Sequence, residues 1–202
     1  MHEKRGQMLN APLRKLLLLC LIYAIGLGAE ASSWTVERLM HSLASVEQRQ
    51  VRFSEIRELT LLQQALTSEG SLSFQRPDNL IKQFDPPNGL RYEIDANRLL
   101  INKSDGREEI IRLDNAPQLQ AYVAALQAVL AGNLQRLQTY FELHLDGDPD
   151  SWQLTLLPKQ PGLARQIVQI EITGAHSDID RFVVSEQGGD RIITRLHARH
   201  AE

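Results

Sequence analysis

Cysteine is almost absent from this sequence, which contains one, Cys20, among 202 residues. Cys20 lies inside an apolar run near the N-terminus, so the chain beyond that run has no cysteine and no disulfide framework. A lipid anchor at Cys20 is disfavoured, because Leu18 and Leu19 stand where a lipoprotein signal prefers small residues. The fold must therefore be stabilised by packing and hydrogen bonds.

Catalytic motifs are also missing. Beyond the N-terminal run there is no Gly-x-Ser-x-Gly turn, no phosphate-binding glycine loop and no Cys–His pair. A Ser-His-Asp triad, whose members meet only in space, stays open, but no sequence feature supports one. We expect a protein without enzymatic activity and without a cofactor.

The first 31 residues have the pattern of an export signal. Basic residues precede an apolar run from Leu16 to Gly28, and Ala29-Glu30-Ala31 forms the small-x-small sequence that a signal peptidase accepts. The run is shorter than the about 20 apolar residues of a membrane-spanning helix. We expect cleavage after Ala31 and a single mature domain of residues 32–202.

The charge balance argues against a nucleic-acid partner. The whole chain has 22 basic and 25 acidic residues. The leader holds four basic and two acidic residues, which leaves 18 and 23 and a net charge of −5 in the expected mature chain. Proteins that bind nucleic acids usually carry a basic stripe instead.

Hydrophobic periodicity predicts a mainly β protein with few helices. Residues 33–46 have apolar side chains at helical spacing, whereas residues 50–113 alternate with period two between turn-forming sequences such as Asp-Pro-Pro-Asn-Gly. Residues 116–141 read as an alanine-rich and leucine-rich helix, a Gly-Asn stop and a second short helix. Alternation returns in the remaining residues, which contain five more strand candidates.

A sheet of about ten strands has a larger face than three short helices can cover. The fold class we expect is α+β, mainly β, with an antiparallel sheet that curls into an incomplete barrel and helices that form a lid. Such a sheet has an apolar concave face, and ordinary core packing is the alternative role of each residue on it. The candidate cavity residues, chosen for facing and size, are Phe53, Leu72, Phe74, Phe84, Leu126, Trp152, Leu154, Val168 and Ile170.

Two groups of residues resemble metal sites, and neither fits. The sequence Asp-Gly-Asp-Pro-Asp at 146–150 resembles the start of a calcium loop, but Ser151 and Leu157 occupy the places of the required glycine and glutamate. His197 and His200 have metal-pair spacing on a helix, but their surroundings are strand-like and offer no third ligand. We expect no bound metal.

Arg76 follows a predicted strand and precedes Pro77, which cannot donate to a sheet ladder. One interpretation is a solvated arginine at the end of a strand. The other is a guanidinium that donates hydrogen bonds to the helices and holds them over the open end of the sheet. The residue pattern alone leaves both open.

The ordered set of motifs resembles the LolA family of periplasmic outer-membrane lipoprotein carriers. The similar segments are an export signal, an N-terminal helix, VRFSE, GSLSFQRPDNLIKQFDPP, WQLTLLPK and IDRFVVSEQGGDRIITRL. The resemblance implies a periplasmic protein whose unclosed barrel shields acyl chains, with Arg76 as the latch of the lid. It also implies an acylated lipoprotein or lipid as cargo, an inner-membrane donor transporter and an outer-membrane acceptor, in a monomeric protein.

The sequence departs from the family pattern in two places. Arg76-Pro77 is followed by DNLIKQF, with Phe84 as its only aromatic residue, and the chain ends at Glu202 without the C-terminal extension of the larger carriers. These departures favour a carrier dedicated to another lipid or lipid-linked metabolite. Two alternatives stay open: a lipid- or lipoprotein-sensing regulatory module, and a hydrolase with a serine, histidine and acid at the cavity mouth.

Overall fold

The computed structural model describes residues 34–62, 64–95 and 97–197. The expected signal peptide and His200 lie outside these residues. No helix within them is long and apolar enough to cross a membrane.

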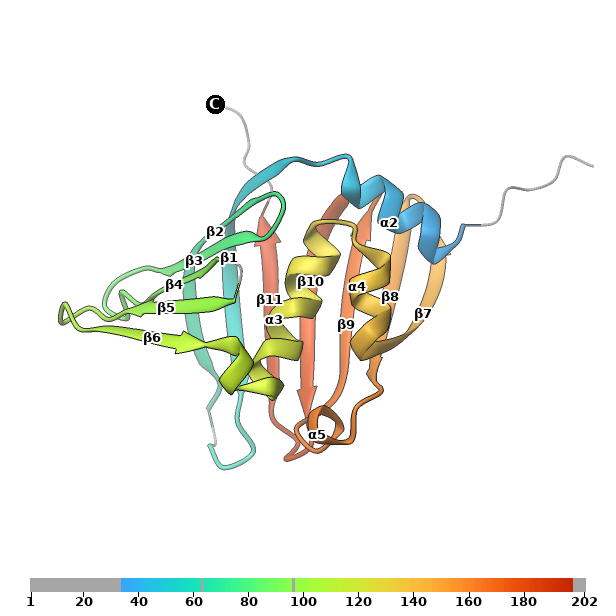
Figure 1. The fold of residues 1–202 in the computed structure, drawn as a ribbon. Helices are drawn as coiled ribbons and strands as arrows, with labels where there is room; N and C mark the ends of the chain where they lie inside the picture. Colours follow the sequence, from blue (N-terminus) through green and yellow to red (C-terminus); the bar gives the residue numbers. More distant parts are fainter. Residues whose placement is uncertain (1–33, 63, 96, 198–202) are drawn as a thin grey trace, which may run out of the picture. The chain divides into compact units, whose positions relative to one another are not determined.

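A single antiparallel sheet dominates the fold (Figure 1). In the described residues it has eleven strands in the order β6-β5-β4-β3-β2-β1-β11-β10-β9-β8-β7. The strands are β1 (Gln48–Glu58), β2 (Leu66–Gln75), β3 (Asn79–Phe84), β4 (Arg91–Asp95), β5 (Arg98–Asn102), β6 (Glu108–Arg112), β7 (Phe141–Asp148), β8 (Ser151–Pro158), β9 (Ile167–Ala175), β10 (Asp178–Glu186) and β11 (Arg191–His197). Because β6 and β7 do not pair with each other, the barrel is incomplete, which confirms the expected fold class.

The helices lie against one face of this sheet (Figure 1). They are α2 (Val36–Ala44), α3 (Pro117–Leu130), α4 (Leu134–Tyr140) and α5 (Pro161–Ala164), with a 3-10 turn, η1 (Leu113–Asn115), before α3. Helix α2 contacts α3, α4 and β7, and α3 lies in the hollow of the curl. The short helix α5, which begins at Pro161, was not anticipated from the sequence.

Alternation along the strands places one row of side chains toward the helices. In β1 and β3 this row contains the buried Phe53 and Phe84, whose rings meet edge to face with centroids 5.3 Å apart. Gly70 lies between them in β2, and a Cβ there would lie 2.8 Å from the Phe53 ring. The glycine makes room for the aromatic pair.

The predicted alternation fails at Val168, whose side chain is 44% exposed. Between β10 and β9 the register steps from Ser185–Gln169 to Glu186–Ile167, so Val168 is an extra residue without a partner. This bulge turns Val168 outward and gives the buried position to Ile167. The alternating sequence pattern of β9 places Val168 on the same face as Ile170, and it cannot reveal an inserted residue.

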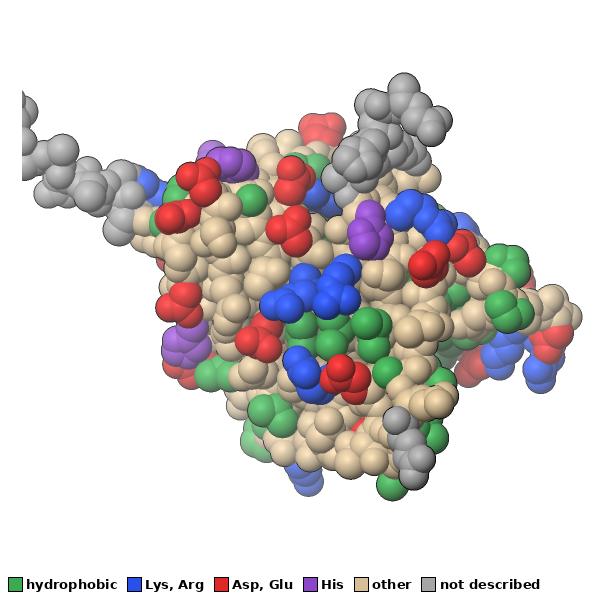
Figure 2. Space-filling model, turned by 180° about the vertical axis from the view of Figure 1, so that it is seen from behind, with side chains coloured by type: hydrophobic (Ala, Val, Ile, Leu, Met, Phe, Trp, Pro, Cys, Tyr) green, Lys and Arg blue, Asp and Glu red, His purple; other side chains and the backbone are tan. Residues whose placement is uncertain are grey.

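The opposite face of the sheet carries a mixture of charged side chains (Figure 2). A small apolar group lies among them, formed by the register neighbours Ile56, Val183 and Ile193. Val183 and Ile193 are buried although they lie outside the main core. Figure 2 shows charged side chains of both signs around this group.

Gly132 allows α3 to end against α2. Its φ is +64°, and the amides of Gly132 and Asn133 donate to the carbonyls of Val129 and Ala128, the pattern of a Schellman cap. A Cβ at Gly132 would lie 2.2 Å from the carbonyl oxygen of Met40. Only glycine combines this turn with this close approach.

The substitution Gly132→Ala is expected to lower the free energy of unfolding by about 2 kcal/mol or more, because it adds both backbone strain and a backbone clash. Chemical denaturation measures this change. Gly162→Ala is the matched control, since no atom lies within 4 Å of its Cβ position. An equal effect of the two substitutions would contradict the packing described here.

Candidate functional site

A cavity of about 800 Å³ lies between helix α3 and the inner face of the sheet. Strands from both halves of the curl form its walls, and α3 covers it. Its apolar lining residues are Leu72, Leu80, Tyr92, Ile94, Leu99, Ile101, Ile111, Ala116, Leu119, Tyr122, Val123, Ala125, Leu126, Leu156, Ile167, Ile170, Ile172, Phe182, Val184, Ile192 and Leu196. The volume is within the range of about 300 to 1,000 Å³ that small-molecule sites occupy.

The candidate cavity residues are distributed over three places. Leu72, Leu126 and Ile170 line the cavity. Phe53, Phe74, Phe84, Trp152 and Leu154 are buried in the core and lie outside the set that lines it. Val168 points away from the interior, for the reason given above.

One end of the cavity reaches solvent. The lining there includes Arg165, Gln166, Gln187 and Gly188, all exposed, from the segment after α5 and the β10–β11 turn. Arg57, at the end of β1, also lines the cavity and has a side chain that is 44% exposed. An apolar ligand that enters here meets a polar rim first.

Arg76 ties the opposite end of the fold together. Its Nη1 donates to the carbonyl oxygens of Ala44 and Ala131, each at 2.8 Å. Ala44 is the last residue of α2, and Ala131 directly follows α3. The guanidinium thus donates hydrogen bonds to carbonyl groups at two helix C-termini, which have no partner within their own helix. The helix dipole also favours a cation there.

Gln127 makes a second connection between the sheet and α3. This residue is completely buried, and its Nε2 donates to the carbonyl oxygen of Asp78 in the β2–β3 turn. Its Oε1 accepts from Nη2 of Arg136 at 3.0 Å. The turn that carries Arg76 therefore holds α3 through two separate contacts.

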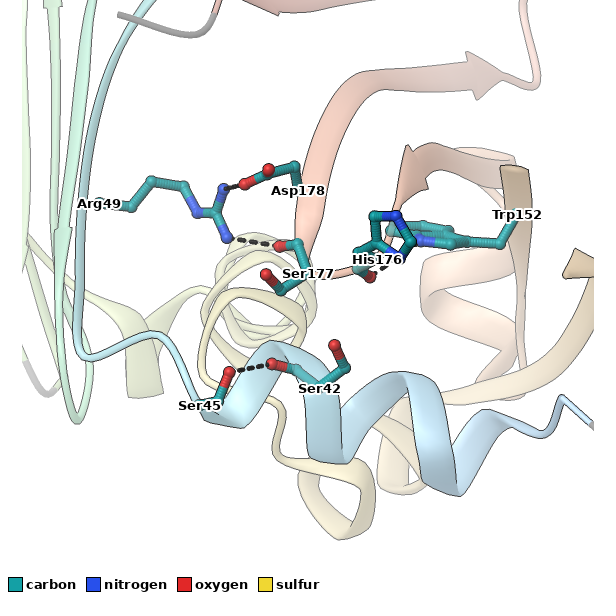
Figure 3. A network of polar contacts seen from close by, with 7 residues as sticks. All are labelled: Ser42, Ser45, Arg49, Trp152, His176, Ser177 and Asp178. Carbon is teal, nitrogen blue, oxygen red and sulfur yellow. Dashed lines mark hydrogen bonds and ion pairs between the residues drawn. The ribbon is translucent and has the colours of Figure 1, made fainter. Parts of the chain in front are cut away.

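Arg49 closes the same end of the sheet (Figure 3). From β1 it reaches the β9–β10 turn, where Nη1 lies 3.0 Å from Oδ1 of Asp178 and Nη2 donates to the carbonyl of Ser177 at 2.6 Å. Trp152 donates from Nε1 to the carbonyl of His176 in that turn at 3.1 Å. Figure 3 shows both contacts beside α2.

A charged cluster interrupts the apolar inner face. Glu55 of β1 is 1% exposed, and its Oε1 accepts from Nε of Arg57 at 3.0 Å. Its Oε2 accepts from Nζ of Lys82 and from Oγ1 of Thr194, the latter at 3.0 Å. Arg57, Lys82 and Thr194 all line the cavity, so the cluster belongs to its wall.

Burial and ion pairing shift the pKa values of this cluster in opposite directions. Burial tends to raise the pKa of Glu55, but attraction to Lys82 and hydrogen bonds from Lys82 and Arg57 outweigh it and hold the pKa below its ordinary value. Burial lowers the pKa of Lys82, and attraction to Glu55 opposes that shift. Burial, with a contribution from the charge of Glu55, raises the pKa of Tyr122 to about 12, so its phenol is neutral.

Glu55 and Gln127 were missed in the sequence, although each left a signal. Glu55 follows Phe53 by two residues in β1, so strand alternation places its carboxylate in the same inward row. Gln127 lies within the apolar body of α3, four residues after Val123. A polar residue at an inward position indicates a buried partner, which the sequence does not identify.

The described residues show no group of three or more His, Cys, Asp or Glu side chains able to hold a metal ion. Nε2 of His197 lies 3.0 Å from Oγ of Ser54. Among the described residues that line the cavity there is no serine and no histidine.

The family model described as outer membrane lipoprotein carrier protein LolA-like matches residues 28–198. The chain belongs to the LolA-like family. This membership confirms the resemblance found in the sequence. A search of curated proteins finds no match.

Solved structures of related fold are distant in sequence. A LolA superfamily protein from Nitrosomonas europaea has a TM-score of 0.47 at 10% identity, covering 82% of this chain and 93% of that one. A domain assigned to outer membrane lipoprotein sorting in Vibrio parahaemolyticus has a TM-score of 0.47 at 7% identity, covering 83% and 92%. The MucA/MucB complex of Pseudomonas aeruginosa gives 0.40 at 13% identity, covering 83% and 59%.

The substitution Arg76→Leu is expected to increase amide hydrogen exchange at the C-terminal ends of α2 and α3, because both lose a charge-assisted hydrogen bond worth about 1 kcal/mol or more. Exchange followed by mass spectrometry measures it. Arg98→Leu is the control, since the partner of Arg98 within the described residues is the nearby Asp95 on the surface. Unchanged exchange at both helix ends in the Arg76 variant would show that the bonds do not hold the helices.

The lowered pKa of Glu55 predicts an acid-sensitive fold. Glu55 contributes stability above its ordinary pKa of about 4.3, and that stability is lost as pH falls through its lower pKa in the folded protein. Between pH 7 and pH 2, the wild type should lose more free energy of unfolding than the double variant Glu55→Leu/Lys82→Met. At pH 7, Lys82→Met alone should cost about 3 kcal/mol. Parallel pH profiles of wild type and double variant would contradict this assignment.

Proposed function

We propose that this protein is a periplasmic carrier that binds the acyl chains of a lipoprotein, a lipid or a lipid-linked metabolite and shuttles them toward the outer membrane. The observation that carries the proposal is the open, largely apolar cavity of about 800 Å³ beneath α3. Membership of the LolA-like family supports it.

Burial of apolar surface supplies the driving force for loading. Each methylene group removed from water contributes about 0.8 kcal/mol, so a chain that buries only a few of them gains several kcal/mol. The walls offer side chains from both halves of the sheet, such as Leu72 and Ile170. An acyl chain between them replaces water at an apolar surface.

Release requires the lid to open. Helix α3 supplies Leu119, Tyr122 and Leu126 to the cavity, so a shift of α3 exposes it. The polar contacts of Arg76 and Gln127 with the helices must break for α3 to shift. Arg76 is in this view the latch of the lid.

The proposed carrier acts without catalysis, cofactor or metal. Its partners are an acylated cargo, a donor transporter in the inner membrane and an acceptor at the outer membrane, and it works as a monomer without nucleic acid. A sensing module of the cell envelope, the alternative from the sequence, uses the same cavity but forms a stable complex with a regulatory protein.

Native mass spectrometry of protein purified from the cells that express it tests the proposal. A carrier is expected to hold a molecule with an acyl chain, and a sensor a stable protein partner. A protein that carries neither, and that binds no fatty acid when one is added, would contradict both functions.

The substitution Leu119→Trp is expected to weaken binding of a fluorescent fatty acid, because the larger side chain fills space in the cavity. Each pair of displaced methylenes costs about tenfold in affinity. Gln135→Trp is the control, since this residue of α4 is exposed. Equal affinities of the two variants would place the acyl chain elsewhere.

A further inference from the structure

We propose that Arg57 and Lys82 bind the anionic head group of the ligand, a carboxylate or a phosphate, while its tail occupies the apolar part of the cavity. This inference rests on the proposed function and narrows its cargo to an amphiphile with a negatively charged head. It starts from the position of the charged cluster inside the cavity wall.

The hydrogen bonds of the cluster leave donors available. Both carboxylate oxygens of Glu55 are occupied by Arg57, Lys82 and Thr194. Arg57 uses only Nε for this contact, and neither of its Nη atoms has a partner among the described residues. Lys82 has three N–H donors, of which Glu55 takes one. Glu55 is thus a positioning residue that fixes two cations beside the cavity.

The charges around the cavity do not cancel. The cations that line it are Arg57, Lys82 and Arg165, and the acids are Glu186 in the lining and Glu55 behind Lys82. Three positive charges against two negative ones leave an excess of one cation. An anionic head group offsets this excess, whereas a neutral or cationic head does not.

A neutral acyl chain alone gives no reason for these residues. An ion pair in an apolar environment is often no more stable than well-packed apolar side chains of the same volume. Nζ of Lys82 also lies 4.8 Å from the ring centroid of Phe53 and 4.9 Å from that of Phe84, so aromatic faces hold it as well. The cavity wall thus holds a fixed cation at a place where an apolar side chain could pack.

The arrangement also separates head from tail. Arg57 lies where the cavity reaches solvent, and Lys82 lies deeper, with 21% of its side chain exposed. Tyr122 of α3 lines the same space and offers a neutral hydroxyl as a further donor. A head group near these three residues leaves the walls around Ile94 and Phe182 for the tail.

Titration calorimetry at pH 8 with three probes of equal tail length tests this inference. The probes are palmitate, pentadecyl phosphate and methyl palmitate, each with a 15-carbon alkyl tail. The wild type is expected to bind at least one of the two anions about tenfold or more tightly than the neutral ester, and the tighter anion identifies the head group. Arg57→Gln is expected to reduce that preference about tenfold, whereas Arg195→Gln, on the outer face of β11, should leave it unchanged.

A second variant keeps the test independent of folding defects. Glu55→Leu/Lys82→Met removes the buried pair together, so that no unpaired charge remains, and it should also reduce the preference for the anion. Equal affinities of the wild type for all three probes, or a preference that survives in both variants, would overturn the head-group site and leave the proposed function standing. If the wild type binds none of the probes, the proposed function itself fails.

Discussion

The structure depends on an apolar concave surface that its own helices do not fill. Eleven described strands curl without closing, and their inward rows are largely aliphatic and aromatic. Water against such a surface is unfavourable, so something apolar must cover it. Helix α3 covers part of it, and the remaining hollow of about 800 Å³ is the basis of the proposed function in acyl-chain binding.

The two ends of the curled sheet differ in chemistry. At the end under α2, Arg49 and Arg76 bind backbone carbonyls and an aspartate, and thereby hold turns and helices together. At the other end, exposed residues from the segment after α5 and from the β10–β11 turn surround the opening. In the proposed carrier the ligand enters from the polar side, and Arg76 restrains the lid at the opposite side, with Glu55 and Lys82 along the wall between them.

Sequence periodicity anticipated most of the fold and little of the site. Local periodicity predicts most of the elements: a period of two marks the strands, and helical spacing marks α2, α3 and α4. The exposure of Val168 did not follow, because a bulge is set by the register with β10. Glu55, Lys82 and Thr194 come from three strands, and their meeting depends on a strand order that no local pattern encodes. Arg76 stood out in the sequence beside Pro77, and the family resemblance implied its latch role. Its two carbonyl partners are seen only in the structure.

A spin-labelled fatty acid provides the most direct measurement of the central claim, that an acyl chain lies inside the curl. With isoleucine methyl groups labelled for NMR, the bound label should broaden the signals of Ile94, Ile170 and Ile172, which line the cavity. Ile56 and Ile193, on the outer face, should broaden less. Broadening confined to the outer isoleucines, or absent from both sets while the fatty acid is bound, would contradict the account.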